Sequence, residues 1–137
     1  MLPRCFLLLP ALLLLGGCST FESKFRRADV DRDGRLNWVE FSDGVAKVSF
    51  RYYDTNKDGY VQLEEWQAVE LGTGDPKKFA LRDLNHDGKI SLAEGQKAAA
   101  KNRRFAKLFA RVDTNHDGYI EIAEAKAYFH PPAAKKP

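Results

Sequence analysis

Four twelve-residue segments of this 137-residue chain place oxygen-bearing side chains at alternate positions. They start at Asp29, Asp54, Asp83 and Asp113, and each has Asp first, Asp or Asn third, Asp fifth, Gly sixth, an aliphatic residue eighth and Glu twelfth. Calcium is a hard cation that takes roughly six to eight oxygens at about 2.3 to 2.6 Å. A short loop with this spacing can surround one such ion, so the sequence predicts four calcium-binding loops.

The predicted ligands fall at six positions of each loop. Positions one, three and five supply side-chain oxygens from Asp29, Asp31 and Asp33, from Asp54, Asn56 and Asp58, from Asp83, Asn85 and Asp87, and from Asp113, Asn115 and Asp117. Position seven supplies a backbone carbonyl, so its side chain is free to vary, as in Arg35, Tyr60, Lys89 and Tyr119. Position nine, which often acts through water, holds Asn37, Gln62, Ser91 and Glu121. Position twelve holds a carboxylate able to give two oxygens, in Glu40, Glu65, Glu94 and Glu124.

Two further positions shape the loops. Position six is glycine in every loop, because the chain must turn there with a positive φ that only glycine adopts at little cost. Position eight is aliphatic in every loop, in Leu36, Val61, Ile90 and Ile120. We expect these aliphatic residues to join two loops through a short β-bridge, so that each loop and its helices form half of a pair.

The four segments resemble the calcium loops of the EF-hand family, and the resemblance covers roughly residues 19–130. A single Asp-rich stretch could instead be a solvated turn, but four complete matches argue against that alternative. The resemblance implies an all-α fold of four helix–loop–helix units, or hands, in two pairs, with up to four Ca²⁺ ions bound. Ion binding and folding should be coupled, since an ion relieves the repulsion among clustered carboxylates.

Apolar residues flank the loops at helical spacing. A phenylalanine stands four residues before each loop, in Phe25, Phe50, Phe79 and Phe109, and we expect these side chains in the core. Between the second and third hands, Gly72 can end one helix, and Asp75 can cap the next with Pro76 in its first turn. This break favours a division of the chain into two halves.

The predicted halves are residues 18–72 with hands 1 and 2, and residues 73–130 with hands 3 and 4, followed by a disordered tail over residues 131–137. Only thirteen residues, 41–53, separate loops 1 and 2. If they form one unbroken helix, these loops cannot face each other as they do in calmodulin-like proteins. Gly44 could permit a bend, so the sequence leaves the pairing open.

The first eighteen residues differ from the rest of the chain. Arg4 precedes an apolar run over residues 5–15, which is too short to span a bilayer as a helix. A charged start, a short apolar run and small residues before a cleavage point are typical of a secretory signal peptide, here residues 1–17. Residues 15–18 also resemble the lipobox of bacterial lipoproteins. That resemblance implies a lipidated Cys18, which would carry palmitate or a similar chain as a membrane anchor; the alternative is ordinary cleavage with Cys18 as a free thiol.

The resemblance places the protein in the bacterial cell envelope, with Ser19 favouring the outer membrane, facing the periplasm or the surface. Cys5 would leave with the signal peptide, so no internal disulfide is expected. The main hypothesis is a calcium sensor or a calcium-stabilised binding module. The only methionine is Met1, so the methionine-rich groove of promiscuous sensors is not expected. Any protein partner stays unidentified, and no nucleic-acid partner is expected.

The sequence raises two other function classes. One is an adhesion or assembly module that contacts anionic envelope components through a basic helix face, comprising Lys97, Lys101, Arg104, Lys107 and Arg111; its alternative is a solvated helix face. The other is an enzyme, which we do not expect, because no pair of nucleophile and base is visible. His86 and His116 both stand at loop position four, where the side chain should point outward.

Overall fold

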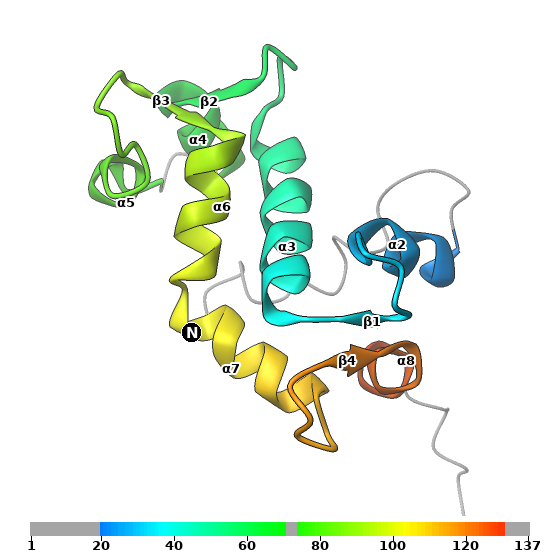
Figure 1. Cartoon of the computed structure of the whole chain (residues 1–137). Coiled ribbons are helices and arrows are strands. Elements are labelled where there is room, and N and C mark those ends of the chain that lie inside the picture. The colour runs from blue at the N-terminus through cyan, green and yellow to red at the C-terminus, as the bar shows by residue number, and fades with distance from the viewer. Residues whose placement is uncertain (1–19, 71–73, 131–137) are drawn as a thin grey trace, which may run out of the picture. The chain divides into compact units, whose positions relative to one another are not determined.

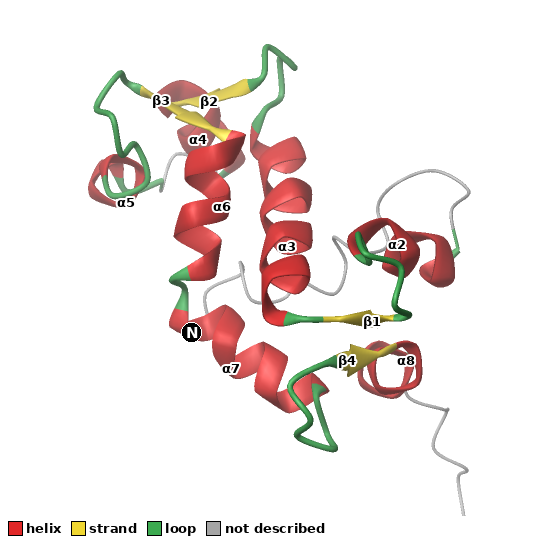
Figure 2. Cartoon of the chain, in the orientation of Figure 1, coloured by secondary structure: helices red, strands yellow, loops and turns green. Residues whose placement is uncertain are grey.

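The computed structural model describes residues 20–70 and 74–130 of the chain. The predicted signal peptide, Cys18, Gly72 and the predicted tail lie outside the described residues. In chain order the elements are α2 (Phe21–Ala28), β1 (Arg35–Leu36), α3 (Trp38–Tyr53), β2 (Tyr60–Gln62), α4 (Leu63–Val69), α5 (Pro76–Ala80), β3 (Lys89–Ser91), α6 (Leu92–Ala100), α7 (Arg103–Val112), β4 (Ile120–Glu121) and α8 (Ile122–Phe129) (Figures 1 and 2). The predicted all-α fold of paired hands is confirmed. None of the described helices is both long enough and apolar enough to cross a membrane.

Local side chains set the starts of the helices. Thr20 caps α2, because its hydroxyl accepts from the backbone N–H of Ser23 at 3.3 Å. Asp75 caps α5 by accepting from the backbone N–H of Lys77 at 2.9 Å, with Pro76 as the first helical residue. The predicted cap at residue 75 is therefore confirmed.

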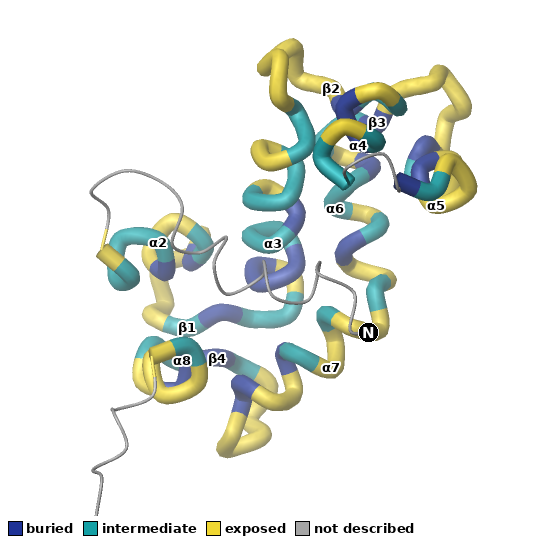
Figure 3. Tube along the Cα trace, turned by 180° about the vertical axis from the view of Figure 1, so that it is seen from behind, coloured by how far each residue is buried: buried dark blue, intermediate teal, exposed yellow. Residues whose placement is uncertain are grey.

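The four short strands join the loops in twos. β1 pairs antiparallel with β4, with Leu36 opposite Ile120, and β2 pairs antiparallel with β3, with Val61 opposite Ile90. These are the aliphatic residues of loop position eight, and all four are buried (Figure 3). The predicted bridge between loops is confirmed, and it joins hand 1 to hand 4 and hand 2 to hand 3.

The predicted division into residues 18–72 and 73–130 is wrong. The contacts divide the described chain into unit 1, with residues 20–41 and 103–130, and unit 2, with residues 42–102. The reason is α3, which runs from Trp38 to Tyr53 without a break at Gly44. Its 16 residues span about 24 Å, so loops 1 and 2 leave opposite ends of one helix and pair with other loops.

Each unit has its own core. In unit 2, Val61, Trp66, Phe79 and Ile90 form a buried cluster, with Phe50, Tyr53 and Leu63 packed against it. In unit 1, the rings of Trp38 and Phe41 pack on Phe109, with centroid distances of 5.6 and 5.4 Å. Of the four phenylalanines that precede the loops, Phe25, Phe79 and Phe109 are buried and Phe50 is half-buried. Burial of these rings fixes the helices on which the loops are mounted.

Candidate metal centres

The loops share one backbone turn. The glycine at position six has a positive φ in every loop, between 81° and 87°. The residue at position four is also left-handed in every loop, with φ of 62° at Arg32, 62° at Lys57, 60° at His86 and 59° at His116. The glycine was predicted, but the residue at position four was missed, because arginine and lysine give no sequence signal for this conformation and histidine gives only a weak one. Both histidines are exposed, as expected.

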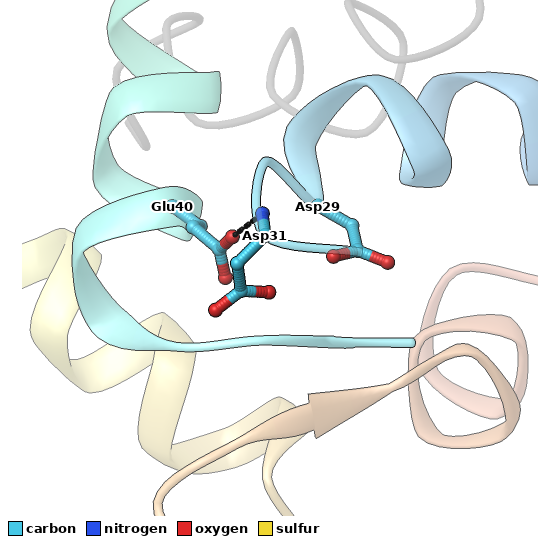
Figure 4. Close-up of side chains that lie close together, drawn as sticks. All are labelled: Asp29, Asp31 and Glu40. Atoms are coloured by element: carbon cyan, nitrogen blue, oxygen red, sulfur yellow. Dashed lines mark hydrogen bonds between the residues drawn. The ribbon is translucent and has the colours of Figure 1, made fainter. Parts of the chain in front are cut away.

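The glutamate at position twelve ties the two ends of its loop together. In loop 1, Glu40 Oε1 accepts from the backbone N–H of Val30 at 2.8 Å, and Oε2 accepts from that of Asn37 at 3.1 Å. Glu40 Oε1 also accepts from the backbone N–H of Asp31 at 3.3 Å (Figure 4). The same three bonds recur in the other loops at 2.8 to 3.2 Å. Because the glutamate belongs to the first turn of the exiting helix, loop closure and helix start share one side chain.

Backbone N–H groups also hold the aspartates. The aspartate at position one accepts through Oδ2 from the glycine N–H at 2.9 to 3.2 Å in all four loops. The aspartate at position five accepts through Oδ1 from the N–H of position seven at 2.8 to 2.9 Å. Each carboxylate is therefore oriented by the turn itself, with oxygens left for a cation.

Carboxylates converge in loops 1 and 2. Oxygens of Asp29, Asp31 and Glu40 lie within 4.8 Å of one another, as do oxygens of Asp54, Asp58 and Glu65. In Figure 4 the two aspartates come from the loop and Glu40 from the start of α3. Like charges at this separation repel, and a divalent cation among them removes that cost.

Asp29 adds a second sign of an ion site. Its side chain is buried, with 7% exposed, and among the described residues nothing donates a hydrogen bond to its buried Oδ1. A buried carboxylate oxygen without a partner is costly. A cation in loop 1 would satisfy this atom. The donors are all oxygens and include a glutamate that can give two, so the residues fit calcium better than the smaller, octahedral magnesium.

Three of the loop glutamates have a lowered pKa. Burial by itself would raise the pKa of Glu65, but hydrogen bonds from the backbone of Gln62 and Asn56 and from Thr55 outweigh burial, and the pKa lies below its usual value. Burial and hydrogen bonds from the matching positions act in the same way on the pKa of Glu94 and of Glu124. These carboxylates are held in the charged form that binds metal.

Loop 1 differs from the others at position three. In loops 2, 3 and 4 the asparagine Nδ2 donates to Oδ2 of the aspartate at position five, at 3.1, 3.0 and 3.3 Å. Asp31 cannot donate, so loop 1 has a third carboxylate among positions one, three and five and lacks this bond. In its place Arg35 Nη2 donates to Asp33 Oδ2 at 3.5 Å. Loop 1 therefore lacks the asparagine donor that compensates the aspartate at position five in the other loops, and it uses a guanidinium instead.

Position two was also missed by the sequence interpretation. The hydroxyls of Thr55 and Thr114 donate to Oε1 of the glutamate at position twelve, at 3.0 and 2.9 Å. Loops 1 and 3 have Val30 and Leu84 at this position and make only the backbone bond. A hydroxyl residue in two of four equivalent positions was the available signal.

Side chains at positions seven and nine do more than the sequence predicted. Across the strand pairs, the Arg35 guanidinium lies 4.1 Å from the Tyr119 ring centroid, and Lys89 Nζ lies 5.0 Å from that of Tyr60. These cation–π contacts link the two loops of each pair. At position nine, Asn37 and Ser91 accept from the backbone N–H of Glu40 and Glu94, and Gln62 donates to Asp58. Glu121 caps α8 in the same arrangement.

Comparison with known proteins agrees with this geometry. The EF hand family model matches residues 23–46, 47–69, 77–94 and 105–129. The chain is 34% identical over 91 residues to "Probable calcium-binding protein CML33" of Arabidopsis thaliana, covering 51% of this chain and 66% of that protein. It is 34% identical over 83 residues to "Calcium-dependent protein kinase 32" of the same organism, covering 48% of this chain and 15% of the kinase. The chain thus spans only part of each relative's length, and no solved structure gives a significant match.

Helix–loop–helix units with converging oxygen ligands define a class of cation-binding proteins. The family match covers more than half of the chain, and the loops, glycines and strand pairs have the corresponding geometry. This chain belongs to the EF-hand family and binds calcium through its hands.

Proposed function

We propose that each of the four loops takes one calcium ion and that the ions stabilise the folded protein, which acts at a bacterial membrane surface as a calcium-stabilised binding module. The main support is the buried, unpartnered Oδ1 of Asp29 in a loop whose carboxylate oxygens lie within 4.8 Å of one another. Such an arrangement is costly by itself and favourable around a cation. No catalytic step is part of the proposal.

Loop closure links the ion to the helices. The glutamate at position twelve belongs to the exiting helix and accepts from both ends of its loop. A cation shared by this glutamate and the aspartates would hold helix and loop together. We favour this stabilising role over a promiscuous sensor, because Met1 is the only methionine and sensor hands expose methionine-rich grooves.

Urea unfolding in calcium and in chelator tests the proposal, with emission of Trp38 and Trp66 as the signal for units 1 and 2. When free calcium is about a hundredfold above its Kd, each occupied site should add about 2.7 kcal/mol to the free energy of unfolding. Calorimetry should give four ions per chain, and Glu65→Gln should reduce that number or weaken one site. Equal unfolding midpoints in calcium and chelator would contradict the proposal.

The membrane location rests on the sequence of residues 1–18. We propose that residues 1–17 are removed and that Cys18 is lipidated, which would anchor the protein to the envelope, at the outer membrane. Mass spectrometry of the mature N-terminus tests this directly. Cys18→Ser should move the protein from the membrane fraction to the soluble fraction, and an unmodified Cys18 thiol would contradict the anchor.

A further inference from the structure

Helix α7 carries its cations on one side. It contains four basic and no acidic residues. At 100° per residue, these four fall within an arc of about 100°, and all are exposed: Arg103, Arg104, Lys107 and Arg111. The opposite side holds Phe109 and Val112, which are buried in unit 1. Packing of the apolar side therefore fixes the basic side toward solvent.

Three of the four cations on this side have no carboxylate partner among the described residues. Within residues 20–70 and 74–130, the ion pairs join Arg35 to Asp33 and Lys126 to Glu22. No described carboxylate lies within ion-pair distance of Arg103, Lys107 or Arg111. Three lysine or arginine charges thus face solvent along about two turns of helix, where a multivalent anionic surface can meet them together.

Calcium binding would change the net charge of unit 1, to which α7 belongs. Unit 1 has ten Lys and Arg and nine Asp and Glu in residues 20–41 and 103–130, a net charge of +1. Two calcium ions in loops 1 and 4 would raise it to +5. Arg111 stands two residues before Asp113, the first residue of loop 4. Two residues span less than about 8 Å, which is within the Debye length of about 10 Å at about 0.1 M salt. The electrostatic potential at this end of α7 therefore depends on whether loop 4 holds a calcium ion.

We propose that the basic side of α7, comprising Arg103, Arg104, Lys107 and Arg111, binds an anionic phospholipid surface, and that calcium in loops 1 and 4 strengthens this contact. The choice of a lipid surface rests on the proposed anchor, because α2 of the same unit begins three residues after Cys18. Unit 1 is the unit that the anchor holds beside the bilayer. Exposed Arg26 and Arg27 on α2 add to its positive charge.

The test uses residues 18–137 with Cys18→Ser, so that no lipid anchor contributes. Removing residues 1–17 leaves every described contact in place, because the described fold begins at Thr20. Sedimentation with phosphatidylcholine vesicles, with and without phosphatidylglycerol, is measured in calcium and in chelator. We expect binding only with phosphatidylglycerol, weakened at least about tenfold by chelator and weakened by salt.

Substitution separates α7 from general positive charge. The combined variant Arg103→Gln, Lys107→Gln and Arg111→Gln should bind roughly a hundredfold more weakly, since each basic residue near an anionic surface contributes about 1 kcal/mol. The matched control makes the same charge change in unit 2, with Lys47→Gln, Lys77→Gln and Lys78→Gln, all at exposed positions, and should keep most of the binding. Equal losses in the two variants would overturn the assignment to α7.

Calorimetry on the same samples distinguishes the two proposals. The α7 variant should retain the calcium heats of the parent protein, since it changes no loop residue. Normal calcium heats with no vesicle binding, or with binding indifferent to chelator, would overturn this inference and leave the proposed function standing. Absence of calcium heats in the parent protein would overturn the proposed function itself.

Discussion

Units 1 and 2 build the same paired loops on different supports. In both, an aliphatic residue pairs with its equivalent across two strands, and a cation lies over a tyrosine ring. The strands pair over three residues in unit 2 and over two in unit 1. Loop 1, in unit 1, is the loop with Asp at position three. The closure of each loop thus follows from the twelve-residue pattern, whereas the packing that holds the loops in place comes from residues outside that pattern.

The support in unit 2 is centred on Trp66. Tyr53 stacks on its ring, with a centroid distance of 4.7 Å and an interplanar angle of 15°, and the Arg82 guanidinium lies 5.0 Å from the ring centroid. Tyr53 precedes Asp54 and Arg82 precedes Asp83, so this stack connects the starts of loops 2 and 3. In unit 1 the rings of Trp38 and Phe41 instead meet Phe109 edge to face. The two ion sites of unit 2 therefore share one aromatic residue.

The largest expected effect comes from removing that residue. Trp66→Ala should lower the free energy of unfolding by about 3 to 5 kcal/mol, because it leaves a cavity in the buried cluster. Hydrogen exchange should show the loss first at β2 and β3, with urea unfolding for the total. Tyr128→Ala, at a residue 40% exposed on α8, is the control and should cost less than about 0.5 kcal/mol. Similar costs for both variants would show that Trp66 is not the centre of the unit.

The pairing of the loops can be tested next. Glu40→Gln should weaken calcium binding in loop 1 by about tenfold or more. Calcium binding in loop 4, which pairs with loop 1, should also change, whereas calcium binding in loop 2 should not. In single-tryptophan backgrounds, it should alter the calcium response of Trp38 and leave that of Trp66 unchanged. Glu65→Gln should do the reverse. A response of Trp66 to Glu40→Gln as large as that of Trp38 would contradict the pairing of hand 1 with hand 4.

A smaller effect distinguishes loop 1 from loop 2. Asp31→Asn should raise the stability of the calcium-free protein by about 1 kcal/mol, because an amide at position three can donate to Asp33 and one charge is removed. It should also weaken calcium binding in loop 1. Asn56→Asp should have opposite effects in loop 2. Thermal unfolding in chelator and calcium titration measure both, and changes of the same sign in the two variants would refute the compensation argument.

The smallest effect concerns pH in the absence of calcium. Hydrogen bonds lower the pKa of Glu65 and Glu94 in unit 2 and of Glu124 in unit 1, each from an ordinary value of 4.5. A lowered folded pKa stabilises the fold above the unfolded pKa, and this stability is lost as pH falls from 4.5 through the folded value. In unit 1 the hydrogen bond from Lys126 also lowers the pKa of exposed Glu22, to about 2. Both units should therefore lose stability as the pH falls. Chelated protein followed by Trp66 and Trp38 emission tests this, and greater stability at the lower pH would contradict the sign.

Much of the candidate site was visible in the sequence because its information is local. The turn at Gly34 needs only a residue that tolerates positive φ, and the oxygens of Asp29 and Glu40 meet because twelve residues of fixed spacing bring them together. The left-handed residue at position four and the hydroxyls of Thr55 and Thr114 were not predicted. Their roles depend on the folded backbone, which the residue type alone does not indicate.

The sequence by itself determined the family, the four loops, the strand residues of position eight and the cap at Asp75, since each depends on neighbours within a few residues. Only the tertiary structure decided which hands pair. Residues 38–53 can in principle bend at Gly44 or remain one helix, and the choice depends on packing by residues far away in the chain. Because α3 stays continuous, hand 1 meets hand 4 and hand 2 meets hand 3.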